Sequence, residues 1–530
     1  MRKKILFLGL IGLLAWGLVK ILFFSGITQT PPAPTFRKAT EPGFVWASAG
    51  EHYARGWLGE FLLGQHYRPV WTTPIKVPVL NLAQLKGGMR VGKLGGGQQT
   101  TSLSLIAPNG QTWVLRSLDK DPVNILPPFW RRTVFADLLR DQISASHPYG
   151  ALVVSPLAKA AGIFHTNPQV VFVSASDSHI QPFKNRMGDK LFLLEEKYGD
   201  SARVWPQFKE ASELVDSRVM LDRRFRYQNH RIDEKAFAQC RLFDLFIGDW
   251  DRHEGQWNWA AFSTDSVTYY KPIPKDRDQA FSLYQDGLLP WLLTRNFAMP
   301  KFSHFDYQVT NVKGYTINAS FIDARALTSV TLPEFKALAK QLQAQLTDSV
   351  LEAAVRILPP AVYKLTGPDL VNKLKSRRQN LVAIATKYYR VLARHVIIPG
   401  TDEREKFVIK RLSNGQVQVT IYQLTSAGAV RNLYYQRLFT SHETKEITLH
   451  GLAGADIFEV TGKVEQSIKI NIVGGLGEDI ITDYSQVTSG QKSTIIIDTH
   501  EGNEIIWGPS SEDKTLKEDL SVHYFDREGL

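Results

Sequence analysis

Residues 248–259 read GDWDRHEGQWNW, and residues 275–281 read KDRDQAF. The first segment brings carboxylates, an Arg-His pair and side-chain amides within a few residues of one another. The second adds two carboxylates one residue apart, followed by an apolar Ala-Phe. Phosphoryl transfer uses such a set, because one carboxylate orients the attacking hydroxyl while amide and carboxylate oxygens hold a divalent metal. The two segments therefore predict a phosphoryl-transfer site.

The composition is that of a folded chain with a mildly basic surface. Of 530 residues, 43% are hydrophobic, and the formal net charge is +11. A chain of this length is expected to form two to four domains. The basic residues occur as scattered pairs and not as a long tract, so we expect no nucleic-acid partner. The single cysteine, Cys240, excludes an intrachain disulfide and any Cys-based zinc site.

Residues 1–27 have the pattern of a signal anchor, or alternatively of a signal peptide. Basic residues at positions 2–4 precede an apolar run over 5–24, close to the ~20 residues that span a bilayer. These charges predict a cytoplasmic N-terminus and a translocated body, and no small-residue cleavage site follows soon after the run. We expect the N-terminal helix to contact inner-membrane lipid and the body to lie in the periplasm of a Gram-negative bacterium.

The next segments predict a tether with an N-terminal extension over 28–75 and a β-rich unit over 76–200. Strand-like runs flank a glycine turn at 95–97, and an Asn-Gly turn at 109–110 predicts a hairpin. Backbone amides of a glycine turn can cover phosphates, and a cation on the adjacent strand can neutralise them. Candidate cofactor-binding residues in this unit are Gly95, Gly96, Gly97 and Arg116 or Lys120.

Helices are predicted over 201–399. A capping box at Thr331–Glu334 begins one of them, with apolar residues following at helical spacing. The pair Pro359-Pro360 is expected to stop this helical region, and a second long helix is expected to begin near Pro368.

The remaining segment, 400–530, is predicted to be all β. Two similar turns begin at residues 451 and 474, 23 residues apart, which indicates a small solenoid-like or sandwich domain. Residues 474–481 also fit a calcium-binding nonapeptide, and Asp456 and Asp479 lie in the two turns. Calcium-binding turns of that kind recur about every nine residues. The wider spacing therefore favours structural turns over a calcium site.

In chain order the sequence presents a glycine-rich hairpin, a basic residue on its return strand, a strand ending in acids, a helical region and two Asp-rich loops. This order is similar to that of protein-kinase-like folds. The strand segment at 193–196, which ends in Glu195 and Glu196, resembles their hinge strand, and this resemblance implies that the two acids contact the cofactor. The DRHxxQ loop at 251–256 resembles a loop of the secretory-pathway casein kinases and the phosphatidylinositol kinases. The DxDxxF loop at 276–281 resembles the metal-binding segment of those kinases and of the CotH spore-coat and HipA-like kinases. The resemblance implies an α+β chain, with a bilobal kinase-like domain followed by the small all-β domain.

The same resemblance assigns roles to individual residues. Asp251 would be the catalytic carboxylate, and Asp249 is the competing candidate. Asp276 would be the main metal-chelating carboxylate. The implied metal ligands are Asp276, Asp278 and Gln256, or Asn258 if the first loop is longer. The implied cofactors are Mg²⁺ or Mn²⁺ with ATP.

The chain also departs from these families. Gln256 replaces an Asn or Glu ligand, Arg116 replaces a strand Lys, and no G-x-G-x-x-G motif is present. The nearest acids to a kinase αC-type Glu are Asp137 and Asp141. Two functions follow: metal-dependent phosphoryl or nucleotidyl transfer to an envelope acceptor, or a non-catalytic pseudokinase that acts as an envelope scaffold.

The whole chain resembles the periplasmic part of large outer-membrane surface proteins of Bacteroidetes-type bacteria. In those proteins similar segments precede a membrane barrel. No barrel-like run of alternating strands is present here. The resemblance therefore implies that any outer-membrane barrel partner is a separate protein.

Overall fold

The computed structural model describes residues 16–17, 35–96, 99–199, 201–294, 299–413, 415–490, 492–499, 502–515 and 524–529. Almost all of the predicted signal anchor lies outside these ranges, as does Gly97. Among the helices within these ranges, none combines the length and the apolar character that crossing a bilayer requires.

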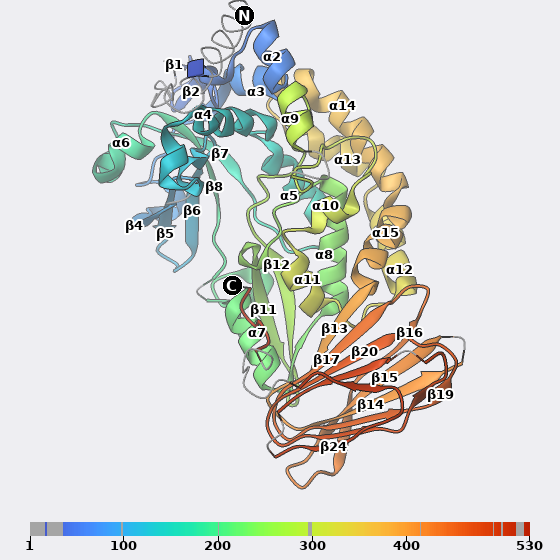
Figure 1. Cartoon of the computed structure of the whole chain (residues 1–530). Helices are drawn as coiled ribbons and strands as arrows, with labels where there is room; N and C mark the ends of the chain where they lie inside the picture. Colours follow the sequence, from blue (N-terminus) through green and yellow to red (C-terminus); the bar gives the residue numbers. More distant parts are fainter. Residues whose placement is uncertain are drawn as a thin grey trace, which may run out of the picture.

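An antiparallel sheet forms the N-terminal lobe (Figure 1). In spatial order its strands are β4 (Arg90–Gly95), β5 (Ser102–Ile106), β6 (Thr112–Ser117), β8 (Lys190–Glu196) and β7 (Gln169–Val173). The predicted hairpin at residues 109–110 joins β5 to β6. In β5 the apolar Leu103 and Leu105 alternate with serines and are fully buried, so the strand has one core face. Two helices, α4 (Val134–Asp141) and α5 (Gly150–Ala160), follow β6.

From residue 35 onward, the segment predicted as tether and extension packs on this lobe. It contains β1 (Phe36–Lys38), β2 (Phe44–Ala47), α2 (Trp57–Leu63), α3 (Arg68–Thr72) and β3 (Ile75–Pro78). The Arg68 guanidinium is 2% exposed and donates to Asp141 Oδ1 at 3.0 Å and to the Gly64 carbonyl at 2.8 Å. A buried, fully bonded arginine fixes this extension to α4.

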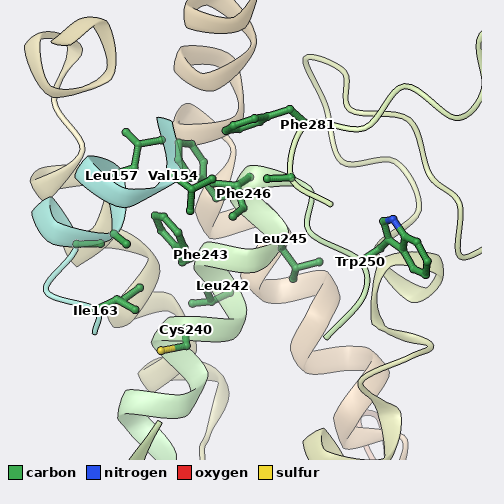
Figure 2. Close-up of a cluster of buried hydrophobic side chains, with 14 of the residues drawn as sticks. Val154, Leu157, Ile163, Cys240, Leu242, Phe243, Leu245, Phe246, Trp250 and Phe281 are labelled. Atoms are coloured by element: carbon green, nitrogen blue, oxygen red, sulfur yellow. The ribbon is translucent and has the colours of Figure 1, made fainter. Parts of the chain in front are cut away.

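The second lobe is mainly helical. Its helices are α7 (Ser217–Arg226), α8 (Glu234–Ile247), α9 (Leu288–Leu293), α10 (Val312–Thr316), α11 (Ser320–Ala326), α12 (Leu332–Gln345), α13 (Asp348–Arg356), α14 (Pro360–Gln379) and α15 (Leu381–Ala393). A small sheet lies beside them, in the order β10 (His230–Ile232), β12 (Thr268–Pro274), β11 (Trp257–Ser263), β9 (Glu213–Asp216). Figure 2 shows Phe243 and Phe246 of α8 beside Val154 and Leu157 of α5, with Phe281 above them. The two lobes therefore share one core.

The prediction of a helix beginning near Pro368 is wrong. Helix α14 begins at Pro360 and runs through Pro368, and α15 follows after Asn380. Proline is well tolerated in the first helical turn, where its missing N–H would have no helical partner. Helix α13 ends at Arg356, so the helical region does stop before the Pro359-Pro360 pair as predicted, but the same pair also starts the next helix.

The C-terminal segment is a small β-solenoid. One sheet contains β13 (His395–Pro399), β17 (Glu446–Ala453), β20 (Lys469–Leu476), β23 (Thr494–Ile497) and β25 (Ser511–Asp513), all parallel. The facing sheet contains β16 (Val430–Thr440), β15 (Gln416–Leu424), β14 (Glu405–Leu412), β18 (Ile457–Thr461), β21 (Ile480–Asp483) and β24 (Glu504–Ile506). Glu446 pairs with Lys469 and Ile457 with Ile480, both 23 residues apart. Successive coils therefore stack with the period that the two turns in the sequence predict.

Candidate active site

A cleft with a cavity volume of about 30 Å³ lies between the N-terminal sheet and the Asp-rich loops. The predicted site residues that line it are Arg116, Lys120, Glu195, Asp276 and Asp278. A second cavity of about 190 Å³ lies between the helical lobe and the solenoid, and none of the predicted site residues lines it. The first cleft is therefore where the predicted chemistry converges.

Asp276 follows β12 in a left-handed backbone conformation, with φ of +52°. Phe281, at the end of the same loop, also has a positive φ of +66°. Such conformations cost energy for residues other than glycine and persist only where the surroundings impose them. Here the Phe281 N–H donates to the Ile247 carbonyl at 3.0 Å, and the Tyr67 hydroxyl donates to the Phe281 carbonyl at 2.7 Å. The loop is thus held by α8 and by the N-terminal extension.

Arg116 joins the two lobes through its guanidinium. Its Nε donates to Glu195 Oε1 at 2.7 Å, and its Nη1 donates to Asp276 Oδ2 at 3.2 Å. Burial alone would raise the pKa of Asp276, but the charges of Arg116 and Lys120 hold it below its ordinary value. Asp276 therefore presents a carboxylate to the cleft at neutral pH.

Glu195 is the acid that partners Arg116. Its other oxygen, Oε2, accepts from the Thr166 hydroxyl at 2.9 Å, and burial raises the pKa of this carboxyl. The neighbouring Glu196 instead accepts from the backbone and side-chain amides of Asn167, at 2.6 and 3.0 Å. Asp141, one of the two acids nearest an αC-type position, is paired with Arg68. A strand acid therefore partners Arg116, where kinases use a helix acid.

Lys120 forms an ion pair with Asp278, the second carboxylate of the loop. Burial lowers the pKa of Lys120, whereas the charges of Asp276, Asp251 and Asp249 raise it. Two cations, on and just after β6, thus face the two carboxylates of the DxDxxF loop.

The first Asp-rich loop begins where Gly248 ends α8 in a left-handed conformation, with φ of +72°. A β-carbon at this glycine would lie 2.8 Å from the ring of Phe305, so the turn has no room for a side chain. Asp249 follows and is 1% exposed, with its Oδ2 3.6 Å from Arg252 and 3.4 Å from Arg277. Its Oδ1 has no hydrogen-bond partner among the described residues, and burial raises its pKa to about 6.

Arg252 ties the two loops together. It is 0% exposed, and its Nη1 and Nη2 donate to the carbonyls of Lys275 at 2.6 Å and Gln256 at 3.0 Å. Its guanidinium lies 4.5 Å from the ring of Trp257. Arg252 therefore positions both loops and does not face a ligand.

Asp251 is only half-buried, and its Oδ1 accepts from Asn318 Nδ2 at 2.7 Å. Its charge acts on Lys120 across the cleft. Of the two candidate bases, Asp251 is the one that a substrate hydroxyl can approach.

Of the two amides predicted as alternative metal ligands, only Gln256 lies beside Asp276. The Gln256 side chain hydrogen-bonds to Asp276 and helps to lower its pKa. Asn258 is on β11, buried, and its amide donates to the Tyr198 carbonyl. Gln256 is therefore the amide beside the metal-loop carboxylate.

The glycine turn joins β4 to β5, as predicted. Gly95 ends β4, and Gly96 has φ of +80°. The Gly96 carbonyl accepts from Arg186 Nη2 at 3.0 Å. The structure of Gly97 lies outside the described residues.

The two Asp-rich loops carry only part of the oxygen ligand set that a magnesium or manganese ion takes. Two carboxylates and an amide oxygen, from Asp276, Asp278 and Gln256, are hard oxygen ligands of the kind that Mg²⁺ uses together with substrate phosphates. No group of three or more His, Cys, Asp or Glu side chains poised to hold a metal occurs in the described part of the chain. The fit therefore needs phosphate oxygens to complete the ligand set.

Three residues beside the cleft were missed from the sequence. Burial lowers the pKa of Lys275, which precedes Asp276, to about 8. Trp71 of α3 and the buried His147 line the cleft. Lys275 could have been found from its position next to the metal loop. Trp71 and His147 lie far from either loop in sequence, and no motif marks them.

No protein-family model matches the chain, and neither does any curated protein. Among solved structures, it is similar to the proinflammatory kinase CtkA of Helicobacter pylori, with 11% identity, a TM-score of 0.31 and coverage of 59% of this chain and 98% of that one. It is also similar to the Golgi casein kinase with Mn/ADP bound (11% identity, TM-score 0.28, 56% and 72% coverage). A third similar structure is HipA of the Shewanella oneidensis MR-1 toxin–antitoxin system (13% identity, TM-score 0.21, 60% and 75% coverage).

These structures belong to the kinase-like families that the two Asp loops resemble, in agreement with the sequence-based prediction. At TM-scores this low the likenesses carry no argument of their own. The case for a function therefore rests on the geometry of the cleft.

Proposed function

We propose that this protein is a metal-dependent phosphotransferase with a kinase-like site. The observation that supports this most is the convergence, in one cleft, of Arg116 and Lys120 from the sheet lobe with Asp276 and Asp278 from the metal loop. Cations and carboxylates on opposite walls can hold a nucleotide's phosphates and the divalent ion that accompanies them.

The residues of the two Asp-rich loops and the two cations of the sheet lobe have separate roles in the proposed transfer. Asp276, Asp278 and Gln256 would hold the metal, which neutralises charge on the phosphates when bound. Arg116 and Lys120 would bind the phosphate oxygens. The acceptor hydroxyl gives its proton to Asp251, its oxygen bonds to the γ-phosphorus, and the bond from that phosphorus to the β,γ-bridging oxygen breaks, which leaves ADP.

A non-catalytic envelope scaffold is the second candidate. The observation in its favour is that each metal-loop carboxylate is already paired with a cation of the protein, Asp276 with Arg116 and Asp278 with Lys120. The periplasmic location and the separate outer-membrane partner belong to this proposal and rest on the sequence alone.

Transfer of labelled phosphate tests the two candidates. The full chain is incubated with Mn²⁺, cell-envelope membranes and ATP labelled on either the γ- or the α-phosphate. We expect label to enter an envelope component from γ-labelled ATP, and the Asp251→Asn variant to lose it. Label from α-labelled ATP would mean nucleotidyl transfer. No label from either form, with folded protein, would favour the scaffold.

A further inference from the structure

Helix α2 is apolar and yet contributes nothing to the core. Its sequence is WLGEFLL, and none of its seven described residues is buried. Trp57 is 78% exposed, Leu58 53% and Phe61 60%. Burial of apolar surface normally drives a helix of this composition into the core. An exposed apolar helix of this kind therefore indicates a surface that a membrane or another protein covers.

Helix α9, which is far from α2 in the sequence, extends the same surface. Its sequence is LLPWLL, with only Pro290 buried, and it packs against α2. A β-carbon at Gly287, just before α9, would lie 2.2 Å from the backbone nitrogen of Gly64, just after α2, so the two helices meet closely. Trp291, Leu292 and Leu293 are each between 43% and 46% exposed. We define the α2/α9 patch as Trp57, Leu58, Phe61, Trp291, Leu292 and Leu293.

We propose that the α2/α9 patch is a membrane-contacting surface, and that it inserts into the interface of the bilayer that the N-terminal segment enters. The apolar run at 5–24 ends only about thirty residues before Trp57 in the sequence. Figure 1 places α2 and α9 at the same end of the molecule as β1, where the continuously described chain begins, and the solenoid at the opposite end. The patch therefore lies at the end of the molecule where the continuously described chain begins.

The chemistry of the patch suits a lipid interface. Tryptophan is enriched at the headgroup level, and leucine and phenylalanine bury readily in the acyl boundary. Nearby on β1, Arg37 and Lys38 are exposed and would meet anionic headgroups. The metal loop that begins at Asp276 runs on directly to α9. Contact with the bilayer would thus hold the cleft near the membrane, whether or not the cleft transfers phosphate.

Lipid-borne quenching tests the proposal. The only native thiol, Cys240, is buried, and burial raises its pKa to about 12, so a thiol-reactive dye will label an introduced surface cysteine selectively. An environment-sensitive dye is attached to the full chain at Leu58→Cys or Leu292→Cys. Val430→Cys, 58% exposed on β16 of the solenoid, is the control. The proteins are reconstituted into vesicles of phosphatidylethanolamine and phosphatidylglycerol that carry spin-labelled lipid.

We expect spin-labelled lipid to quench roughly half of the fluorescence at positions 58 and 292 and almost none at 430, because interfacial helices sink ~5–10 Å into the headgroup and acyl boundary. Dyes at 58 and 292 that stay open to aqueous iodide would overturn the proposal. Dyes shielded from iodide but not quenched by lipid would also overturn it, since a protein partner or a second copy would then cover the patch.

Discussion

Asp249 and Asp251 are two positions apart in the sequence, but their carboxylates differ in how deeply they are buried. Asp249 is fully buried between Arg252 and Arg277, and burial raises its pKa to about 6. Asp251 is half-buried, and its carboxylate accepts a hydrogen bond from the side-chain amide of Asn318. A general base must reach the proton that it accepts. Asp249 therefore orders the arginines of the loop, and Asp251 is the residue to which the proposed function assigns the role of base.

The Asp251→Asn variant tests whether Asp251 acts as the general base. The amide keeps the shape of the side chain but cannot accept the proton, so we expect phosphate transfer to fall by about 10²- to 10⁴-fold. Nucleotide binding should persist, because the phosphate and metal groups are elsewhere in the cleft. Rates of phosphate transfer from γ-labelled ATP, measured for the native protein and the variant, check the expected fall. Unchanged transfer would exclude Asp251 as the base.

At the scale of elements, the solenoid stacks acidic side chains at its corners. The Asp456 N–H donates to Asp479 Oδ1 at 2.8 Å, and the Asp479 N–H donates to Asn503 Oδ1 at 2.7 Å. Nearby, Asp498 is 1% exposed, and its Oδ1 accepts from the Thr499 N–H at 2.7 Å. These contacts use one oxygen of each side chain as a backbone cap, while Oδ2 of Asp456 and Oδ2 of Asp498 are buried without a hydrogen-bond partner among the described residues.

Asp498 gives the solenoid a stability that depends on pH. Burial raises its pKa from the ordinary 3.8 to about 6, so between these values the folded state holds a proton that the unfolded state has released. Its contribution to the free energy of unfolding is therefore greatest below pH 4 and is lost as the pH rises through 6. Asp498→Asn should raise the free energy of unfolding at pH 8 by roughly 2–3 kcal/mol and change little at pH 3.5.

Denaturant unfolding at the two pH values measures this difference. Asp265→Asn, in an exposed turn, serves as the control and should show no dependence on pH. A stabilisation of Asp498→Asn that is equal at both pH values would contradict the assignment.

The elements that sequence predicts well are those with a local signal. The hairpin at 109–110, the capping box at Thr331 and the 23-residue coil spacing all appear as expected. The start of α14 was misplaced at Pro368 because the Pro359-Pro360 pair, which follows the end of α13 as predicted, also begins the next helix. The Arg116–Glu195 pair and the contact of Tyr67 with Phe281 could not be predicted, since they join residues 79 and 214 positions apart with no shared motif.

At the scale of the whole molecule, the solenoid is fixed to the helical lobe by buried polar contacts. Arg437 of β16 is 6% exposed, donates to the Thr328 carbonyl, and donates through Nη2 to the Tyr389 hydroxyl at 3.2 Å. Gln228 Nε2 donates across the same junction to Glu405 Oε1 at 2.8 Å. Such bonds define one orientation between the two parts.

The Arg437→Ala variant tests this junction. Truncation leaves the Thr328 carbonyl without its charged donor, so we expect the free energy of unfolding to fall by about 2 kcal/mol. Arg431→Ala, exposed on the same strand, is the control and should change it by less than ~0.5 kcal/mol. Equal effects of the two substitutions in denaturant titrations would mean that the junction adds no stability.

Thermal unfolding tests most directly whether the chain has a nucleotide and metal site that depends on Asp276. The full chain in detergent is melted with ATP, with Mn²⁺ and with both, beside Asp276→Asn, since asparagine tolerates the left-handed backbone found there. Asp265→Ala is the control. A ligand that binds only the folded state raises the melting temperature once its concentration exceeds its Kd. We predict a rise that requires ATP and Mn²⁺ together, present in the control and lost in Asp276→Asn. No rise in the folded native protein would contradict the account.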